Sequence, residues 1–208
     1  MNVKKAYEIW AEYYDSTNNK TRDLEAIAIR ELLKNIQFDT CLEIGCGTGK
    51  NTRWLVERCN EIVAVDFSEK MVAKAKEITP SGKVSFKIAD INKPWKFAEK
   101  QFALITFSLV LEHIEHLDLI FKKASDFTTA GGHIYIGELH PFKQYSGSKA
   151  RFETAEGELT VTCYIHNISD FTLSAEKHGF EIVTINEFFD NNNRESIPRI
   201  LSLLFRKK

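Results

Sequence analysis

Three closely spaced glycines and a carboxylate further along the chain form the pattern with the clearest chemical meaning. Residues 42–52 read LEIGCGTGKNT, so Gly45, Gly47 and Gly49 alternate with other residues after an apolar stretch. A glycine has no Cβ, so the backbone there can approach a ligand closely. A helix that follows such a turn points its first N–H groups at the ligand. Asp66 lies 21 residues beyond Gly45, where a carboxylate can accept both hydroxyls of a ribose.

Two common phosphate-binding patterns do not match this turn. A Walker A loop requires G-x-x-x-x-G-K-[ST], but the segment Gly45–Gly49 is one residue short and Asn51 stands at the Ser/Thr position. A dinucleotide fingerprint requires a small residue where Lys50 stands. The remaining G-x-G-x-G turn, with Glu43 two residues before it, fits a ligand that has a ribose and an amino acid instead of a pyrophosphate. S-adenosylmethionine is such a ligand.

Four motifs in chain order resemble those of the class I S-adenosylmethionine-dependent methyltransferases. The run Glu-Ile-Gly-Cys-Gly-Thr-Gly at 43–49 resembles their first motif, and residues 63–68 with Met71 resemble the second. Ala-Asp-Ile at 89–91 resembles the third motif, and Ser-Leu-Val-Leu-Glu-His at 108–113 resembles the fourth. Four motifs at family spacing are more specific than any one of them.

This resemblance implies a cofactor, a fold and a set of contacts. The cofactor is S-adenosyl-L-methionine, with S-adenosyl-L-homocysteine as product. The fold is a Rossmann-like, doubly wound α/β sheet of about seven strands, mostly parallel with an antiparallel last strand. The expected cofactor-binding residues are Tyr14, Glu43, Gly45, Cys46, Gly47, Gly49, Asp66, Phe67, Met71, Ala89, Asp90, Ile91, Ser108, Leu109 and His113. Within this set, Gly45 and Gly47 are expected at the methionine part, Asp66 at the ribose, and Phe67 and Met71 at the adenine faces.

Asp90 is also a candidate on chemical grounds. It follows an alternating strand, and its carboxylate can accept a hydrogen bond from an exocyclic amine. The resemblance places it with Ile91 at the adenine edge. The alternative for Asp90 is an ordinary helix or turn cap, and the alternative for Asp66 is an Asx turn at a strand end. Met71 has core packing as its alternative, which is compatible with adenine contact.

Two histidines and two tyrosines are the candidates on the acceptor side. His140 follows a predicted strand, at the carboxyl edge where open α/β sheets bind substrates. His140 and His166 are therefore candidate catalytic bases, with loop side chains in water as the alternative. Tyr13 and Tyr164 are candidate substrate contacts.

No metal site is predicted. The segment 112–116 reads EHIEH and has two histidines three residues apart, but it lacks the order and spacing of the H-E-x-x-H zinc motif. The four cysteines, at 41, 46, 59 and 163, include no C-x-x-C pair. We therefore expect reduced thiols.

Apolar segments that alternate with helical ones must position these residues. The segments typical of strands are 41–44, 61–65, 84–89, 102–107, 133–137, 180–185 and 200–205. The predicted helices lie within the first forty residues, at about 48–59, after the N-cap Ser68, around 117–124, and at 169–178 before Gly179. Strands that alternate with helices predict a parallel sheet. The short connection 186–199 permits an antiparallel pairing of the last two strands at the sheet edge, and residues 138–168 are expected to be irregular.

The domain organisation follows from length and motif placement. The 208 residues contain no evident linker, which predicts a single domain over 1–208. Residues 1–37 are expected to form an N-terminal helical cap and 38–140 the cofactor-binding core, where the resemblance is closest. Residues 141–168 are a candidate substrate lid or insertion, and a hairpin within 142–163 is one form it could take.

Charge and hydropathy limit the partners and the cellular location that we expect. Twenty-eight basic and 29 acidic residues leave a net charge of −1, so nucleic acid is not an expected partner. The chain lacks a signal core or an apolar run of membrane-spanning length, which predicts a cytoplasmic protein without membrane association. The late elements 138–141, 164–166 and 179–181 resemble those of the small-molecule methyltransferases.

The resulting interpretation is methyl transfer to a small-molecule O, N or C nucleophile. One alternative is a non-catalytic module that binds S-adenosylmethionine, and another is a methyltransferase that acts on protein or RNA. The sequence leaves the identity of the acceptor and the oligomeric state open.

Overall fold

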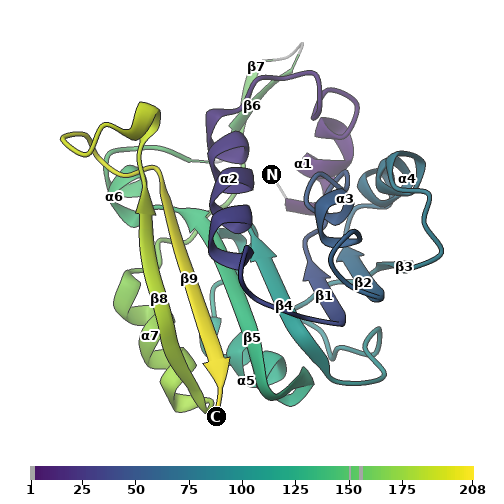
Figure 1. The fold of residues 1–208 in the computed structure, drawn as a ribbon. Helices are drawn as coiled ribbons and strands as arrows, with labels where there is room; N and C mark the ends of the chain where they lie inside the picture. The colour runs from purple at the N-terminus through teal and green to yellow at the C-terminus, as the bar shows by residue number, and fades with distance from the viewer. Residues whose placement is uncertain (1–2, 150, 155–156) are drawn as a thin grey trace.

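A seven-stranded mixed sheet forms the centre of the computed structural model, which describes residues 3–149, 151–154 and 157–208 (Figure 1). The strand order is β3-β2-β1-β4-β5-β9-β8. The strands are β1 (Thr40–Ile44), β2 (Glu61–Asp66), β3 (Val84–Ile88), β4 (Phe102–Ser108), β5 (Thr128–Leu139), β8 (Phe180–Phe188) and β9 (Ile200–Lys207). Strand β9 runs antiparallel to both of its neighbours, β5 and β8, and the other strand pairs of this sheet are parallel. A separate antiparallel pair is formed by β6 (Arg151–Thr154) and β7 (Gly157–Thr160).

Helices cover both faces of the sheet. They are α1 (Val3–Trp10), α2 (Lys20–Leu33), α3 (Thr52–Leu55), α4 (Glu69–Ile78), α5 (Leu117–Phe127), α6 (Pro141–Tyr145) and α7 (Ile168–Lys177), with short 3₁₀ turns η1 (Leu111–His113) and η2 (Asp190–Asn192). Helix α2 packs on β5 and β9, while α5 and α7 lie on the other side of the sheet and α4 packs on β2 and β3 (Figure 1). In the described residues, no helix is long and apolar enough to cross a membrane.

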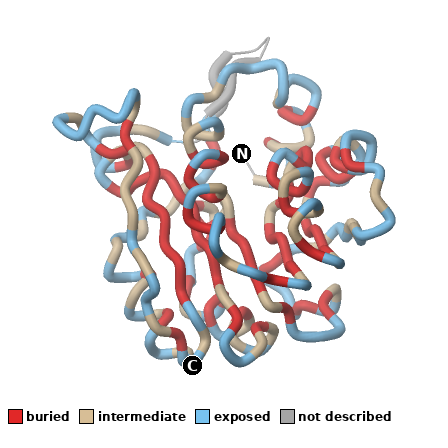
Figure 2. Tube along the Cα trace, viewed as in Figure 1, coloured by how far each residue is buried: buried red, intermediate tan, exposed pale blue. Residues whose placement is uncertain are grey.

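The core consists of two layers, one on each face of the sheet. In β1, Leu42 and Ile44 pack in the cluster that contains Phe121 of α5 and Phe171 of α7. Cys41, which precedes Leu42 and therefore points to the opposite face, packs in the cluster that contains Ile29 of α2. Strands covered on both faces have no polar side to show, which explains why their sequences are continuous apolar runs. Figure 2 shows the buried residues concentrated on the strands.

The predicted fold class is confirmed, including the antiparallel last strand. The antiparallel pairing of β8 with β9 also lies at the sheet edge, as expected, but β9 itself is inserted between β5 and β8. The expected cap at Ser68 is present, since its side chain accepts the N–H of Met71. The four cysteines, all within the described residues, form no disulfide.

Three local predictions need correction. The helix expected at 48–59 is limited to α3, and it does not begin before Gly49, whose positive φ is incompatible with an α-helix. The strand expected at 133–137 is longer, since β5 begins at Thr128 and runs through Gly131 and Gly132. Residues 138–168 are not irregular throughout, since they contain α6 and the β6–β7 hairpin. Residues 150, 155 and 156 of the candidate lid lie outside the described residues.

Candidate functional site

The glycine turn closes tightly at the carboxyl end of β1. The N–H groups of Gly45 and Cys46 both donate to the carbonyl oxygen of Val65, at 2.7 and 3.0 Å. All three glycines have positive φ, and a Cβ on Gly45 would lie 2.0 Å from Cγ2 of Val110. A Cβ on Gly49 would lie 3.2 Å from the Cβ of Ala75. Gly45 and Gly49 therefore serve close packing against the neighbouring segments.

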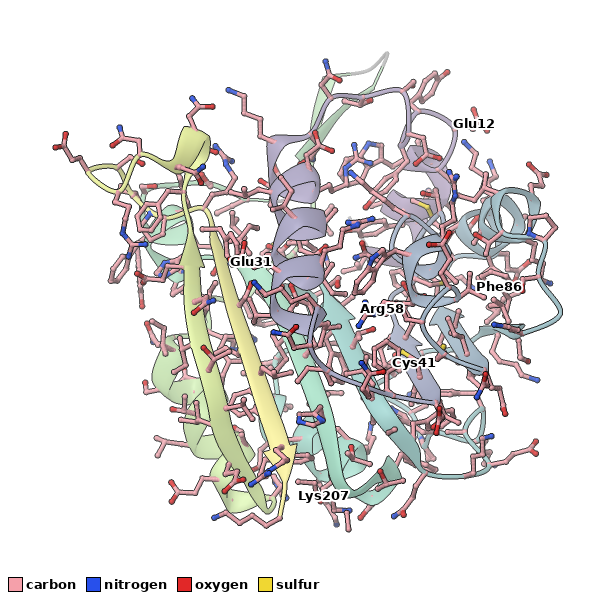
Figure 3. The ribbon with its side chains drawn as sticks, viewed as in Figure 1. Glu12, Glu31, Cys41, Arg58, Phe86 and Lys207 are labelled. Atoms are coloured by element: carbon pink, nitrogen blue, oxygen red, sulfur yellow. The ribbon has the colours of Figure 1, made fainter. Side chains whose placement is uncertain are left out.

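A cavity of about 710 Å³ opens between this turn, the carboxyl ends of the parallel strands and α1. Its wall contains twelve of the expected cofactor residues: Tyr14, Gly45, Gly47, Asp66, Phe67, Met71, Ala89, Asp90, Ile91, Ser108, Leu109 and His113. Four separate sequence motifs thus meet in one cavity, whose size is typical of small-molecule sites. Figure 3 marks the two ends of the molecule, with Glu12 in the N-terminal segment at the cavity end and Lys207 of β9 at the opposite end.

Three expected cofactor residues lie outside the cavity wall. Cys46 and Gly49 belong to the turn but face away from the cavity. Glu43 lies beneath the turn, where it is buried and its Oε2 accepts a hydrogen bond from Oγ1 of Thr52 at 2.6 Å. Burial raises the pKa of Glu43 to about 8, so its carboxyl is mainly protonated at neutral pH. Glu43 therefore supports the glycine turn from beneath and does not face the cavity.

Asp66, at the end of β2, combines an Asx turn with exposure to the cavity. Its Oδ1 accepts the N–H of Ser68 at 2.9 Å, and its Oδ2 accepts the N–H of Gly47 at 3.0 Å. Burial raises the pKa of Asp66 to about 6, and the backbone hydrogen bonds oppose that rise. An Asx turn and a contact with a ribose are therefore compatible roles for Asp66.

The adenine-side candidates lie where β2 and β3 end. Phe67 and Met71 line the cavity, and Met71 is also fully buried, so packing and a ligand contact coexist there. Asp90 lines the cavity while its Oδ1 accepts the N–H of Asn92 at 2.9 Å, which fixes the turn after β3. Ile91 is buried beside it.

Helix α1 packs against α4 and contributes to the cavity wall a residue that the sequence interpretation missed. Tyr7 lines the cavity, and its Oη lies 2.9 Å from Nε2 of His113. The signal was present, since Tyr7, Trp10 and Tyr14 recur at i, i+3 and i+7, the spacing of one helix face. Val3, Lys4 and Thr162 also line the cavity.

The tautomer of His113 follows from its two partners. Nδ1 lies 2.9 Å from the carbonyl oxygen of Thr162, which can only accept, so Nδ1 carries the proton. In the neutral ring Nε2 is then an acceptor, and the hydroxyl group of Tyr7 donates a hydrogen bond to it. Burial raises the pKa of Tyr7 well above its usual value, so the phenol stays neutral.

The other two tyrosine candidates differ in position. Tyr164 lines the cavity, and its N–H donates to the carbonyl oxygen of Glu112 at 2.7 Å. Tyr13 is 63% exposed and lies outside the cavity wall. Its neighbour Tyr14 faces inward, with its ring 3.9 Å from the guanidinium carbon of Arg22.

Neither catalytic histidine candidate lies in the cavity wall. His140 is fully buried, and its Nδ1 accepts the N–H of Phe142 at 3.2 Å while its Nε2 lies 3.0 Å from Oε1 of Glu187. Nε2 of His166 lies 2.7 Å from the carbonyl oxygen of Ile114. The ring nitrogens of His140 are thus occupied by contacts that hold α6 and β8, and the geometry gives no support to a role as base for either histidine.

The EHIEH segment does not gather metal ligands. His113 bonds Tyr7 and Thr162, and His116 stands at the start of α5. In the part of the chain that the structure describes, no group of three or more His, Cys, Asp or Glu side chains could hold a metal ion.

Comparisons with known proteins agree with this geometry. A family model described as methyltransferase domain matches residues 42–136. A malonyl-[acyl-carrier protein] O-methyltransferase of Bacillus cytotoxicus is 32% identical over 213 residues, with 85% of this chain and 75% of that protein covered. Phosphoethanolamine N-methyltransferase 3 of Arabidopsis thaliana is 30% identical over 142 residues, which are 65% of this chain but only 29% of the plant protein. The solved DhpI–SAH complex has a TM-score of 0.76 at 20% identity and covers 98% of this chain and 94% of that one.

Proposed function

Because the chain belongs to the class I S-adenosylmethionine-dependent methyltransferases, we propose that it methylates a small molecule that binds beside α1. The observation that supports this acceptor class is the cavity, whose wall contains Tyr7, Tyr164 and the His113 side chain together with the cofactor motifs. The plant relative named for phosphoethanolamine N-methylation is in line with a small acceptor. The relatives named for N- and O-methylation leave the attacking atom open.

The residues present fit S-adenosylmethionine. Gly47 lines the cavity, and a Cβ on it would meet no atom within 4 Å, so the backbone there borders open space. Asp66 would accept the ribose hydroxyls, and Asp90 would accept the adenine amine. Phe67 and Met71 offer apolar surface to the adenine faces. When bound, the cofactor supplies an electrophilic methyl group, and the protein's task is to orient the nucleophile.

The pair of Tyr7 and His113 would orient the acceptor and take its proton. Since Tyr7 donates its hydroxyl proton to Nε2 of His113, the lone pairs of its oxygen remain to accept an N–H or O–H of the acceptor. An acceptor proton that leaves during the reaction would pass to Oη of Tyr7, and the proton of Tyr7 would pass to Nε2 of His113. The raised pKa of Tyr7 restricts it to this relay, because it does not act as a free phenolate.

The wider assignments are part of the same proposal. A net charge of −1 supports a partner other than nucleic acid, and four cysteines without a disulfide are in line with a cytoplasmic location. We assign residues 38–140 to cofactor binding, 1–37 to a cap over the cavity, and 141–168 to the acceptor side, where Thr162 and Tyr164 already reach the cavity wall.

Calorimetry with S-adenosylmethionine, S-adenosylhomocysteine and NAD tests the cofactor, and a panel of small amines, phenols and carboxylic acids tests the acceptor. We expect saturable binding of the first two compounds, without competition by NAD. Turnover with one chemical class of the panel would establish the acceptor. Binding without turnover across the panel would instead favour the non-catalytic module.

Tyr7→Phe tests the relay, with the exposed Tyr13→Phe as the matched control. Loss of the Tyr7 hydroxyl should lower kcat by about 10²-fold, in the range of general acid–base contributions. The Kd for S-adenosylhomocysteine should stay the same in both variants. An unchanged kcat in Tyr7→Phe would remove Tyr7 from the mechanism.

A further inference from the structure

A buried carboxyl group at the end of β5 holds the backbone of a segment far away in sequence. Glu138 is 3% exposed, and its Oε1 accepts the N–H groups of Val110 at 2.9 Å and Leu111 at 2.8 Å. Its Oε2 lies 3.4 Å from the N–H of Glu112. The donors precede Glu138 by 26 to 28 residues, so these bonds join the loop after β4 to the end of β5.

The segment that Glu138 holds has a conformation that its own sequence does not favour. Leu109 has a φ of +55°, a value that costs a residue with a Cβ free energy. The 3₁₀ turn η1 begins at Leu111, and the side chain of its N-cap residue Val110 makes no capping hydrogen bond. Its first N–H groups would be buried without partners if Glu138 did not accept them.

This segment contributes several residues to the cavity wall. Leu109 and Val110 line the cavity next to the glycine turn, where Val110 leaves no room for a Cβ on Gly45. His113 also lines the cavity and bonds Tyr7, the residue proposed to contact the acceptor. A shift of the segment would therefore change the cofactor and acceptor contacts together.

We propose that Glu138 is a positioning residue for methyl transfer, whose Oε1 holds segment 109–113 so that Leu109 and His113 face the cavity. The inference rests on the proposed function of this cavity, and it adds a residue that does not itself line the cavity.

The role requires an acceptor oxygen, and a negative charge is not needed. Burial, together with the nearby Glu112 carboxyl, raises the pKa of Glu138 to about 8. At neutral pH the group is therefore mainly neutral, and the two lone pairs of one oxygen suffice for the N–H groups of Val110 and Leu111. Glu138→Gln keeps such an oxygen, whereas Glu138→Leu has a similar size and none.

The experiment compares Glu138→Gln and Glu138→Leu with Glu187→Leu, which removes a carboxyl on β8 that bonds His140 outside the cavity wall. The first readout is the Kd for S-adenosylhomocysteine. We expect Glu138→Gln and Glu187→Leu to stay within about twofold of wild type, and Glu138→Leu to bind about tenfold more weakly, the equivalent of one or two buried N–H groups without partners.

The second readout is the NMR signal of the His113 imidazole, which reports its bond to Tyr7 without any turnover. It should move in Glu138→Leu and stay in place in Glu138→Gln. Equal Kd values and equal His113 signals in wild type and Glu138→Leu would overturn the proposal. Failure of the wild type to bind S-adenosylhomocysteine would overturn the proposed function instead.

Amide hydrogen exchange tests the proposal even if Glu138→Leu does not fold. In wild type, the N–H groups of Val110 and Leu111 should exchange slowly, as hydrogen-bonded amides do. In the shorter variant Glu138→Asp, which keeps the carboxyl group but withdraws its oxygens, both should exchange at least about tenfold faster. Fast exchange at Val110 and Leu111 in wild type, or the same rates in Glu138→Asp, would contradict a positioning role.

Discussion

At the scale of single residues, burial shifts the pKa values of titratable groups in the cavity wall. Asp66 has a pKa of about 6 because it lies in a poorly solvated position, although two backbone N–H groups stabilise its charged form. Hydroxyl groups of a ribose would donate to this carboxylate, so the ionised form is the one suited to the ligand.

The affinity for S-adenosylhomocysteine should therefore depend on pH through Asp66. Binding should tighten as the pH rises through about 6 and level off above that value. Well below pH 6 the affinity should fall by up to about tenfold per pH unit, the limit for one linked proton. Calorimetry from pH 5 to pH 8 measures this, and Asp66→Asn, which cannot ionise, should give a flatter profile. A wild-type profile as flat as that of the Asn variant would exclude Asp66 as the linked group.

Asp66→Ala should weaken cofactor binding by roughly 2–3 kcal/mol, because charge-assisted hydrogen bonds are lost and ribose hydroxyls lose their partner. The Kd of a variant shown by circular dichroism to be folded is the relevant measurement. A Kd equal to that of wild type would end the ribose assignment.

Two glycine substitutions test whether the lack of space for a side chain at Gly45 matters for ligand binding. In Gly45→Ala the new Cβ would lie 2.0 Å from Cγ2 of Val110, at a φ of +75°, so the turn and segment 109–113 must separate. Gly82→Ala is the matched control, since a Cβ there meets no atom within 4 Å. We expect Gly45→Ala to bind S-adenosylhomocysteine at least about tenfold more weakly, a cost of about 1.4 kcal/mol or more. Similar Kd values for both variants would show that the turn adapts.

At the scale of elements, short caps and contacts decide where side chains point. Helix α6 has only five residues, and its N-cap is the imidazole of His140. Since Nδ1 of that ring accepts the N–H of Phe142, Nε2 carries the proton and donates to the Glu187 carboxylate. His140 thereby ties α6 to β8 at the carboxyl end of the sheet.

His140→Ala should therefore affect stability more than catalysis. The loss of two hydrogen bonds at a fully buried position should reduce the free energy of unfolding by roughly 1–3 kcal/mol. Urea denaturation measures this quantity, and the Kd for S-adenosylhomocysteine should remain the same. A loss of kcat without a loss of stability would restore His140 as a candidate base.

At the scale of the whole molecule, several buried carboxyl groups make stability dependent on pH. Burial raises the pKa of Glu43 and of Glu138 to about 8 in the folded protein. In the unfolded chain the same groups titrate near ~4.3. Between these values the folded state binds more protons than the unfolded state, so their stabilising contribution is complete at low pH and is lost as the pH rises toward 8.

Glu43→Gln should reduce this dependence. Wild type should lose up to ~1.4 kcal/mol of unfolding free energy per pH unit for each such group between about pH 5 and pH 8. The Gln variant keeps an oxygen for the Thr52 hydroxyl and cannot ionise, so its slope should be smaller and its stability at pH 8 higher. Denaturant titrations at pH 6 and pH 8 give both slopes. Glu31→Gln, at the exposed position on α2 labelled in Figure 3, is the control and should leave the slope unchanged.

The sequence by itself determined the succession of most strands and helices along the chain and which motif residues meet in one cavity. Those features depend on local patterns, namely apolar runs for strands covered on both faces and glycines where the backbone has positive φ. The motif residues lie at strand ends, and parallel strands end at one edge of the sheet, so Gly47, Asp66 and Asp90 meet whatever the details of packing.

Only the tertiary structure decided the acceptor side and the supporting groups. His140 follows a strand as a base would, but side-chain packing turns it inward to Glu187. Tyr7 reaches His113, 106 residues away, only because α1 folds back over the cavity. Glu138 accepts N–H groups of a segment that precedes it by 26 to 28 residues. Such contacts depend on the direction of individual side chains between distant elements, and no local sequence pattern encodes that direction.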